Sequence, residues 1–245
     1  MSGPCFFLSY ARGDETPNGL VRKFFEDLST EVKRLAQGDV SCRNEPGFID
    51  QSIDVGDLWG EKISKALHNS RSVVALCSPK YFRSSYCGRE LQMFRAPDKA
   101  YRRLPAKSKL AVERPIFLVI WKATGLARSV KDIQYFMPRR LNAIYRDYGL
   151  GYIMQDPSQP ENYRALILDL AERVTAEVKK TPALDREDVV CVKPLKSIPP
   201  AFPWWAKRWA QVLFLLLLLK YPNHLLLNIP LHNNNFSYQQ KYSNI

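Results

Sequence analysis

The stretch VVALCSPKYFRSSYCGREL, residues 73–91, decides the fold of this chain. Its first five residues, 73–77, form a short apolar run that predicts a buried strand. A helix is expected to follow and to end before Pro97, because proline removes a helical hydrogen bond. In that helix Glu90 lies four residues after Tyr86, and this spacing places the ring and the carboxylate on one face. The sequence therefore predicts an aromatic platform beside a lone acid at the carboxyl end of a strand.

Strand-like and helix-like segments alternate on both sides of this stretch. The other apolar runs that predict strands are residues 5–9, 47–50, 115–121 and, more weakly, 151–154. The helical patterns cover residues 20–35, 57–67, 130–148 and 163–178. Five strand–helix units in series predict an α/β fold: a flavodoxin-like, doubly wound, five-stranded parallel sheet with helices on both faces. Ligands bind such sheets at the carboxyl ends of the strands, here the loops after Ser9, Asp50 and Cys77.

Composition divides the chain into three parts. Residues 1–180 are expected to form the folded domain, residues 181–203 a proline-punctuated linker, and residues 204–245 a hydrophobic, low-complexity tail. The uninterrupted apolar stretch at 209–219 is shorter than the roughly 20 residues that span a bilayer. Tryptophan and basic residues within 202–222 are typical of interfacial anchors, so this segment is either a membrane contact or a truncated or frame-shifted end.

The formal net charge is +12, which favours anionic partners in general. The basic residues are scattered, however, and form no basic helix and no aromatic-interleaved RNA-binding signature. A generally basic surface is therefore expected rather than a specific nucleic-acid partner.

The five cysteines are odd in number and widely spaced: Cys5, Cys42, Cys77, Cys87 and Cys191. They include no Cys-x-x-Cys pair and no histidine at ligand spacing, so no metal site is expected. Cys5 lies in an apparent core strand, where its thiol is expected to pack as a small apolar group. With no secretory leader at the N-terminus, these features predict a cytoplasmic location.

The order of these motifs resembles that of a bacterial Toll/interleukin-1 receptor (TIR) domain over about residues 4–180. The matching segments are FFLSYAR at 6–12, FID at 48–50 with Gly56 and Trp59, LCSPKYF at 76–82 with Ser84, Cys87, Glu90 and Leu91, and PIFLV at 115–119. The part from Ser-Pro-x-Tyr to Cys-x-x-Glu-Leu is the most specific. One residue departs from the pattern: members that cleave NAD commonly carry Trp four residues before the glutamate, where this chain has Tyr86.

The resemblance implies that NAD is a substrate and not a resident cofactor, which agrees with the lack of a glycine-rich phosphate loop. Nicotinamide leaves from a cationic pyridinium as a neutral base, so one carboxylate is sufficient where ordinary glycosidases need two. The resemblance assigns catalysis to Glu90. The expected substrate-binding residues are Ser9, Tyr10, Arg12, Asp50, Tyr86, Lys80 and Arg83, with Arg89 as a further candidate for the pyrophosphate.

In this family activity generally depends on assembly, in which the loop after the second strand completes a neighbour's site. That loop is residues 51–57 here, and its Ile53, Val55 and Gly56 are the expected assembly residues. The resemblance implies an NAD glycohydrolase that yields linear or cyclic ADP-ribose in bacterial immune signalling or cell suicide.

Other interpretations of the same residues stay open. Glu90 is a solvated helix carboxylate in most unrelated proteins, and Tyr86 is equally a helix-start aromatic that packs under the sheet. A non-catalytic TIR scaffold that pairs with other TIR domains is the second hypothesis, favoured by Tyr86 in place of Trp. A phosphorylatable receiver of the same fold class is weaker, because Cys77 and Ser78 occupy the place of its aspartate.

Overall fold

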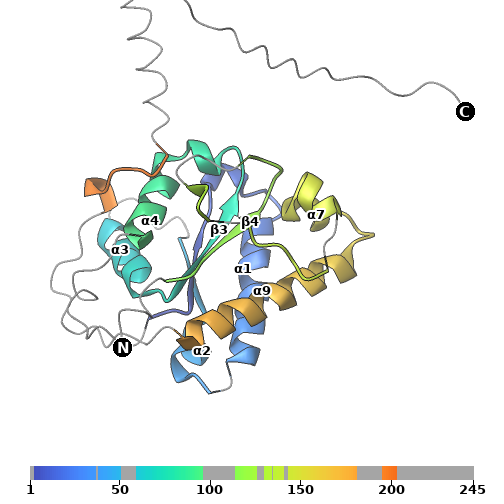
Figure 1. Cartoon of the computed structure of the whole chain (residues 1–245), viewed down its shortest axis with the longest axis horizontal. Helices are drawn as coiled ribbons and strands as arrows, with labels where there is room; N and C mark the ends of the chain where they lie inside the picture. Colours follow the sequence, from blue (N-terminus) through green and yellow to red (C-terminus); the bar gives the residue numbers. More distant parts are fainter. Residues whose placement is uncertain are drawn as a thin grey trace, which may run out of the picture. The chain divides into compact units, whose positions relative to one another are not determined.

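The computed structural model describes residues 3–36, 38–50, 59–95, 114–125, 130–133, 135–140, 143–180 and 195–202. These residues form a four-stranded parallel sheet in the order β2-β1-β3-β4 (Figure 1). The strands are β1 (Phe6–Ser9), β2 (Gly47–Ile49), β3 (Ser72–Cys77) and β4 (Ile116–Ile120). The predicted α/β class and parallel sheet are confirmed. The chain runs from β1 to β2 on one side and returns to β3 on the other, so the strand order reverses next to β1.

Helices cover both faces of this sheet (Figure 1). On one face lie α1 (Leu20–Leu35) and α9 (Pro160–Lys180), and on the other α3 (Trp59–Asn69) and α4 (Ser85–Arg95). The alternation along β1 explains the two cores, since Phe6 and Leu8 pack with α1 and α9 while Phe7 packs with α3 and α4. All three side chains are fully buried. Each contributes roughly 1.5–3 kcal/mol of hydrophobic stabilisation.

The predicted strand at 151–154 is wrong, because these residues are helical. Two short helices, α7 (Ala143–Tyr148) and α8 (Leu150–Ile153), follow each other there, separated by Gly149 at φ 90°. Gly149 also lies so close to Trp121 that a Cβ would stand 2.6 Å from its carbonyl oxygen. Beside β4, Tyr135 makes an isolated parallel bridge to Leu118. The sequence predicts a helix over residues 130–148. Among the described residues of this range, only those of α7 are α-helical.

The predicted linker at 181–203 contains a segment that is part of the domain. Residues 195–202, which we call the strap, begin with a 3-10 turn, η4 (Leu195–Ser197), and pack on the α3–α4 face of the sheet. Leu195 is 3% exposed and Phe202 is 4% exposed, because both join the core formed with α3 and α4. The compact unit extends to Trp204 and not to residue 180. Phe202 is therefore a core residue, whereas the rest of the proposed anchor lies outside the described residues.

No helix in the ranges given above is both long and apolar enough to cross a membrane.

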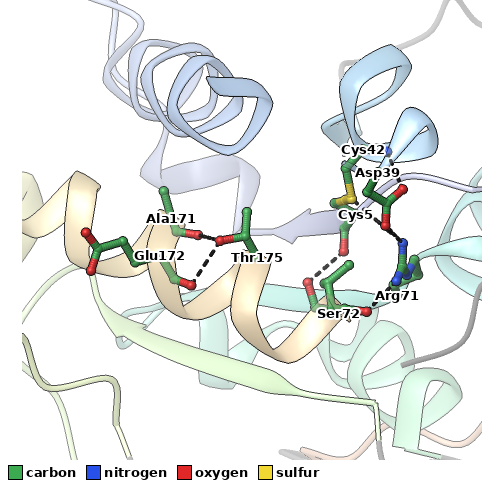
Figure 2. Close-up of a disulfide and its surroundings, with 9 residues drawn as sticks. Cys5, Asp39, Cys42, Arg71, Ser72, Ala171, Glu172 and Thr175 are labelled. Atoms are coloured by element: carbon green, nitrogen blue, oxygen red, sulfur yellow. Dashed lines mark hydrogen bonds and ion pairs between the residues drawn. A yellow bond between two sulfur atoms is a disulfide. The ribbon is translucent and has the colours of Figure 1, made fainter. Parts of the chain in front are cut away.

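A disulfide joins Cys5 at the start of β1 to Cys42 in α2 (Val40–Asn44), with a Cα–Cα distance of 5.2 Å (Figure 2). The expectation that Cys5 packs as a free thiol is corrected by this bond. Arg71 lies beside it and donates hydrogen bonds to Asp39 and to the carbonyl oxygen of Val178 near the end of α9. The disulfide and Arg71 together tie β1, α2 and α9 at the edge of the sheet opposite the carboxyl ends of the strands.

Candidate active site

A pocket of about 380 Å³ lies at the carboxyl ends of β1 and β2, next to the first turns of α4. This is the place where the reversal of strand order leaves room for a ligand. The lining residues are Leu8, Tyr10, Ala11, Arg12, Gly13, Asp50, Lys80, Ser84, Tyr86, Cys87 and Glu90.

Glu90 is the central acid of the pocket and is 2% exposed. The hydroxyl of Ser9, at the end of β1, donates a hydrogen bond of 2.5 Å to Oε2 of Glu90. Ser9 also lies 3.1 Å from the hydroxyl of Tyr81, which belongs to the 3-10 turn η2 (Tyr81–Arg83). Since the single proton of Ser9 is used on Glu90, the Tyr81 hydroxyl must donate to Ser9. The three groups form a buried relay, Tyr81 to Ser9 to Glu90.

The surroundings of Glu90 hold its proton near neutral pH. Burial raises the pKa of the Glu90 carboxyl to about 8; the Ser9 hydrogen bond opposes this rise, Asp50 adds to it and Arg12 counteracts it. A carboxyl group that titrates near neutrality inside a pocket is a physical mark of a functional site.

Asp50 and Arg12 form the polar side of the pocket. Asp50 follows β2 and is 6% exposed, and its Oδ2 lies 3.4 Å from Nη2 of Arg12. The hydroxyl of Tyr10 donates to the carbonyl oxygen of Asp50 at 3.1 Å, which fixes the end of β2 against the exit of β1. The Arg12 side chain is 57% exposed, so its guanidinium can contact a ligand at the mouth of the pocket. Lys80, also exposed, donates to the carbonyl oxygen of Gly13.

Tyr86 and Cys87 line the wall formed by α4. Burial raises the pKa of the half-buried Tyr86 well above its ordinary value, and the neighbouring Glu90 adds to the effect, so the phenol stays neutral. Burial likewise raises the pKa of the Cys87 thiol, and its Sγ lies 3.3 Å from the carbonyl oxygen of Tyr10. A thiol held in its neutral form is a poor nucleophile, which favours a structural role for Cys87.

The structure brings most of the predicted site residues together. Tyr10, Arg12, Asp50, Lys80, Tyr86 and Glu90 line the pocket, and Ser9 lies behind Glu90. Arg83 is exposed and does not line this pocket, so its role in substrate binding stays a prediction. In a 3-10 turn of three residues, Tyr81 faces inward and Arg83, two positions later, faces elsewhere. The assembly residues Ile53, Val55 and Gly56 lie outside the described residues.

Sequence reasoning missed two features of the site. Tyr81 received no role, although it is the fully buried donor to Ser9; its place in the Ser-Pro-x-Tyr motif was the available signal. Arg89 was a pyrophosphate candidate, but its Nε donates to the carbonyl oxygen of Ile198 in the strap. Within the described ranges, no three His, Cys, Asp or Glu side chains are grouped so as to hold a metal ion.

Comparison with known proteins points to one domain family. Residues 6–117 match the family model of the TIR domain, a range that includes β1, β2, β3 and α4 and ends within β4. This part of the chain is therefore similar to a TIR domain.

A stretch of 117 residues is 32% identical to a probable 2′ cyclic ADP-D-ribose synthase, BdTIR, of Brachypodium distachyon. The aligned part is 47% of this chain and 47% of that protein, so the chain spans about half the length of the curated relative it matches.

Proposed function

We propose that this chain is a TIR-type NAD glycohydrolase, which cleaves NAD to nicotinamide and ADP-ribose or a cyclic form of it. The observation that carries the proposal is the buried Glu90 carboxyl, hydrogen-bonded to Ser9 within a pocket at the carboxyl ends of the strands. The TIR domain match and the name of the plant relative support it at the level of the family.

The chemistry suits a site with one carboxylate. The bond between C1′ of the ribose and the nicotinamide nitrogen breaks, and its electron pair stays on the nitrogen, which loses its positive charge. No proton has to be supplied to this leaving group. The positive charge that develops on the ribose is stabilised by the ionised Glu90, which also accepts hydrogen bonds from the ribose hydroxyls. Water, or a hydroxyl of the same molecule, then adds at C1′ to form a new C–O bond and releases its proton to solvent. The hydroxyl route closes a ring.

The other pocket residues are assigned by their position and charge. Arg12 and Lys80 stand at the rim and contact the pyrophosphate, while Tyr86 packs on the nicotinamide ring beside Glu90. The pocket volume lies toward the lower end of the 300–1,000 Å³ typical of ligand sites, so we infer that it takes the nicotinamide riboside half. Self-assembly through residues 51–57 and a role in immune signalling or cell suicide belong to the same proposal.

The test is NAD consumption by the full chain at high protein concentration, with products separated by chromatography. Glu90→Gln preserves shape and removes the charge, so we expect a loss of turnover of about 100-fold or more. Glu26→Gln, at an exposed position of α1, is the matched control and should keep wild-type activity. Equal turnover in wild type and Glu90→Gln would refute the proposal.

A non-catalytic scaffold is the second candidate, favoured by Tyr86 where NAD-cleaving members commonly carry Trp. Wild type that self-associates without consuming NAD would support it. A gain of turnover in Tyr86→Trp would then identify the tyrosine as the reason.

A further inference from the structure

The strap packs directly against the helix that carries Glu90. The amide of Ala201 donates to the carbonyl oxygen of Gly88 at 3.0 Å, and Nε of Arg89 donates to the carbonyl oxygen of Ile198 at 3.1 Å. A Cβ at Gly88 would stand only 3.0 Å from the backbone nitrogens of Ala201 and Phe202. The absence of a side chain at Gly88 thus lets the strap approach α4 closely.

Phe202 connects the strap to the hydrogen-bonded residues behind Glu90, because it packs against Tyr81. Its ring packs edge-on against Tyr81 with 5.8 Å between the ring centroids, and against Phe82 with 5.2 Å. Tyr81 is fully buried, so its ring orientation is set by these neighbours. The direction of the Tyr81 ring decides whether its hydroxyl reaches Ser9, which in turn contacts Glu90.

We propose that Phe202 is a positioning residue for Glu90, acting through the Tyr81 ring and the Ser9 hydroxyl. The expected effect on kcat rests on the proposed function. The expected effect on the ionisation of Glu90 does not. Residues far apart in sequence, at the start and the end of the compact unit, thereby determine the geometry of one carboxylate.

The kinetic test uses the full chain and a double-mutant cycle. Phe202→Leu keeps an apolar side chain but loses the ring edge, and Tyr81→Phe keeps the ring but loses the hydroxyl. Each should lower kcat about five- to tenfold, the value of one buried hydrogen bond, while KM changes by less than about twofold. The double variant should lose no more than either single variant, because both act on the same bond.

Two further variants separate positioning from stability. Leu195→Ala removes a strap residue of the same core whose amide bonds to Ser64 of α3; it should lower the unfolding temperature and leave kcat unchanged. Gly88→Ala displaces the strap, so it should lower both kcat and the unfolding temperature, with a larger loss of kcat than Leu195→Ala shows at an equal loss of stability. Losses of kcat that simply follow the losses of stability across all four variants would overturn the proposal.

A readout without NAD keeps the two proposals distinguishable. The difference in unfolding free energy between each parent and its Glu90→Gln derivative, followed against pH, reports the ionisation of Glu90 alone. The other charged or titratable groups around Glu90 are Arg12, Asp50, Tyr10, Tyr81, Tyr86 and Cys87. Only Tyr81 is altered, in Tyr81→Phe, and burial raises the pKa of its phenol well above its ordinary value, so it stays neutral over this pH range. The hydrogen bond from Ser9 lowers the pKa of Glu90, so weakening it should raise that pKa. The pH range over which the stability difference changes should therefore move upward equally in Phe202→Leu and Tyr81→Phe. An unmoved pH range in Phe202→Leu would refute the positioning role, even if no variant cleaves NAD.

Discussion

Among single side chains, Glu90 sets the pH dependence of the proposed reaction. Its pKa is raised by burial to about 8, and the ionised form is the one that stabilises positive charge. We therefore expect kcat/KM to rise with pH between about 6.5 and 9, with a midpoint near 8. Initial rates of NAD loss over this range, in buffers of constant ionic strength, would check the profile. A flat profile would show that a different group, or a different protonation state, carries the reaction.

The same carboxyl makes stability depend on pH in the opposite direction. Its pKa is higher in the folded chain than the ordinary 4.5, so the folded chain holds a proton that the unfolded chain has lost between pH 4.5 and about 8. The stabilisation is fully present below pH 4.5 and is lost as pH rises through 8, on the order of a few kcal/mol. Urea unfolding of wild type and Glu90→Gln should show this fall in wild type only. An identical pH dependence in the two chains would contradict the raised pKa.

Residue roles could be predicted from sequence where a local motif supplied them. Glu90, Tyr86 and Lys80 lie in one continuous motif, and their common placement on one pocket follows from strand–turn–helix geometry. Arg83 lies in a three-residue 3-10 turn, where each position rotates the side chain by about 120°, so sequence spacing alone does not place it relative to the pocket. The hydrogen bond between Ser9 and Tyr81, 72 residues apart, needs the pairing of β1 with β3 to be seen.

Among helices and strands, periodicity predicted the long elements and failed at short ones. The stripe of α1 and the continuous apolar runs of β1, β3 and β4 were sufficient to define them. At residues 151–154 a four-residue apolar segment fits a strand or one helical turn equally well. The close contact of Gly149 with Trp121, which is tertiary, decides for the helix. The predicted fifth strand is therefore absent from the described residues, whose sheet has four strands.

The disulfide between β1 and α2 gives a prediction at the level of these elements. It closes a separation of 37 residues, for which restriction of the unfolded chain predicts about 3–4 kcal/mol of stabilisation. Cys42→Ser should lower the unfolding temperature under oxidising conditions, and a thiol reductant should lower that of wild type but not of the variant. Catalysis should be unchanged at temperatures where both chains are folded. If the reductant affected neither chain, the bond would contribute nothing to stability.

At the scale of the whole domain, the strap is part of the folded unit, which therefore extends beyond residue 180. A chain ended at residue 180 lacks Leu195 and Phe202, each worth roughly 1.5–3 kcal/mol of burial, and exposes the core that they cover. We expect it to unfold at lower denaturant concentration than a chain ended at residue 204. Guanidinium unfolding of the two chains measures the difference, and equal midpoints would show that the strap adds no stability.

Composition could not reveal this boundary, because prolines in residues 181–203 are equally typical of linkers and of extended segments that pack on a domain. The packing of the strap depends on the surface that it contacts: Gly88 lets its backbone approach α4 closely, and the rings of Tyr81 and Phe82 pack edge-on against Phe202. Such complementarity joins residues more than 100 positions apart and leaves no periodic pattern in the sequence.

The bond between Cys5 and Cys42 also closes the N-terminal part of the chain into a covalent ring that contains β1 and α1. A protease that cuts once within this ring opens it without releasing a fragment. The nicked protein would run as one band on a gel without reductant and as two with it, so mapping flexible sites in the first forty residues by proteolysis requires both gels.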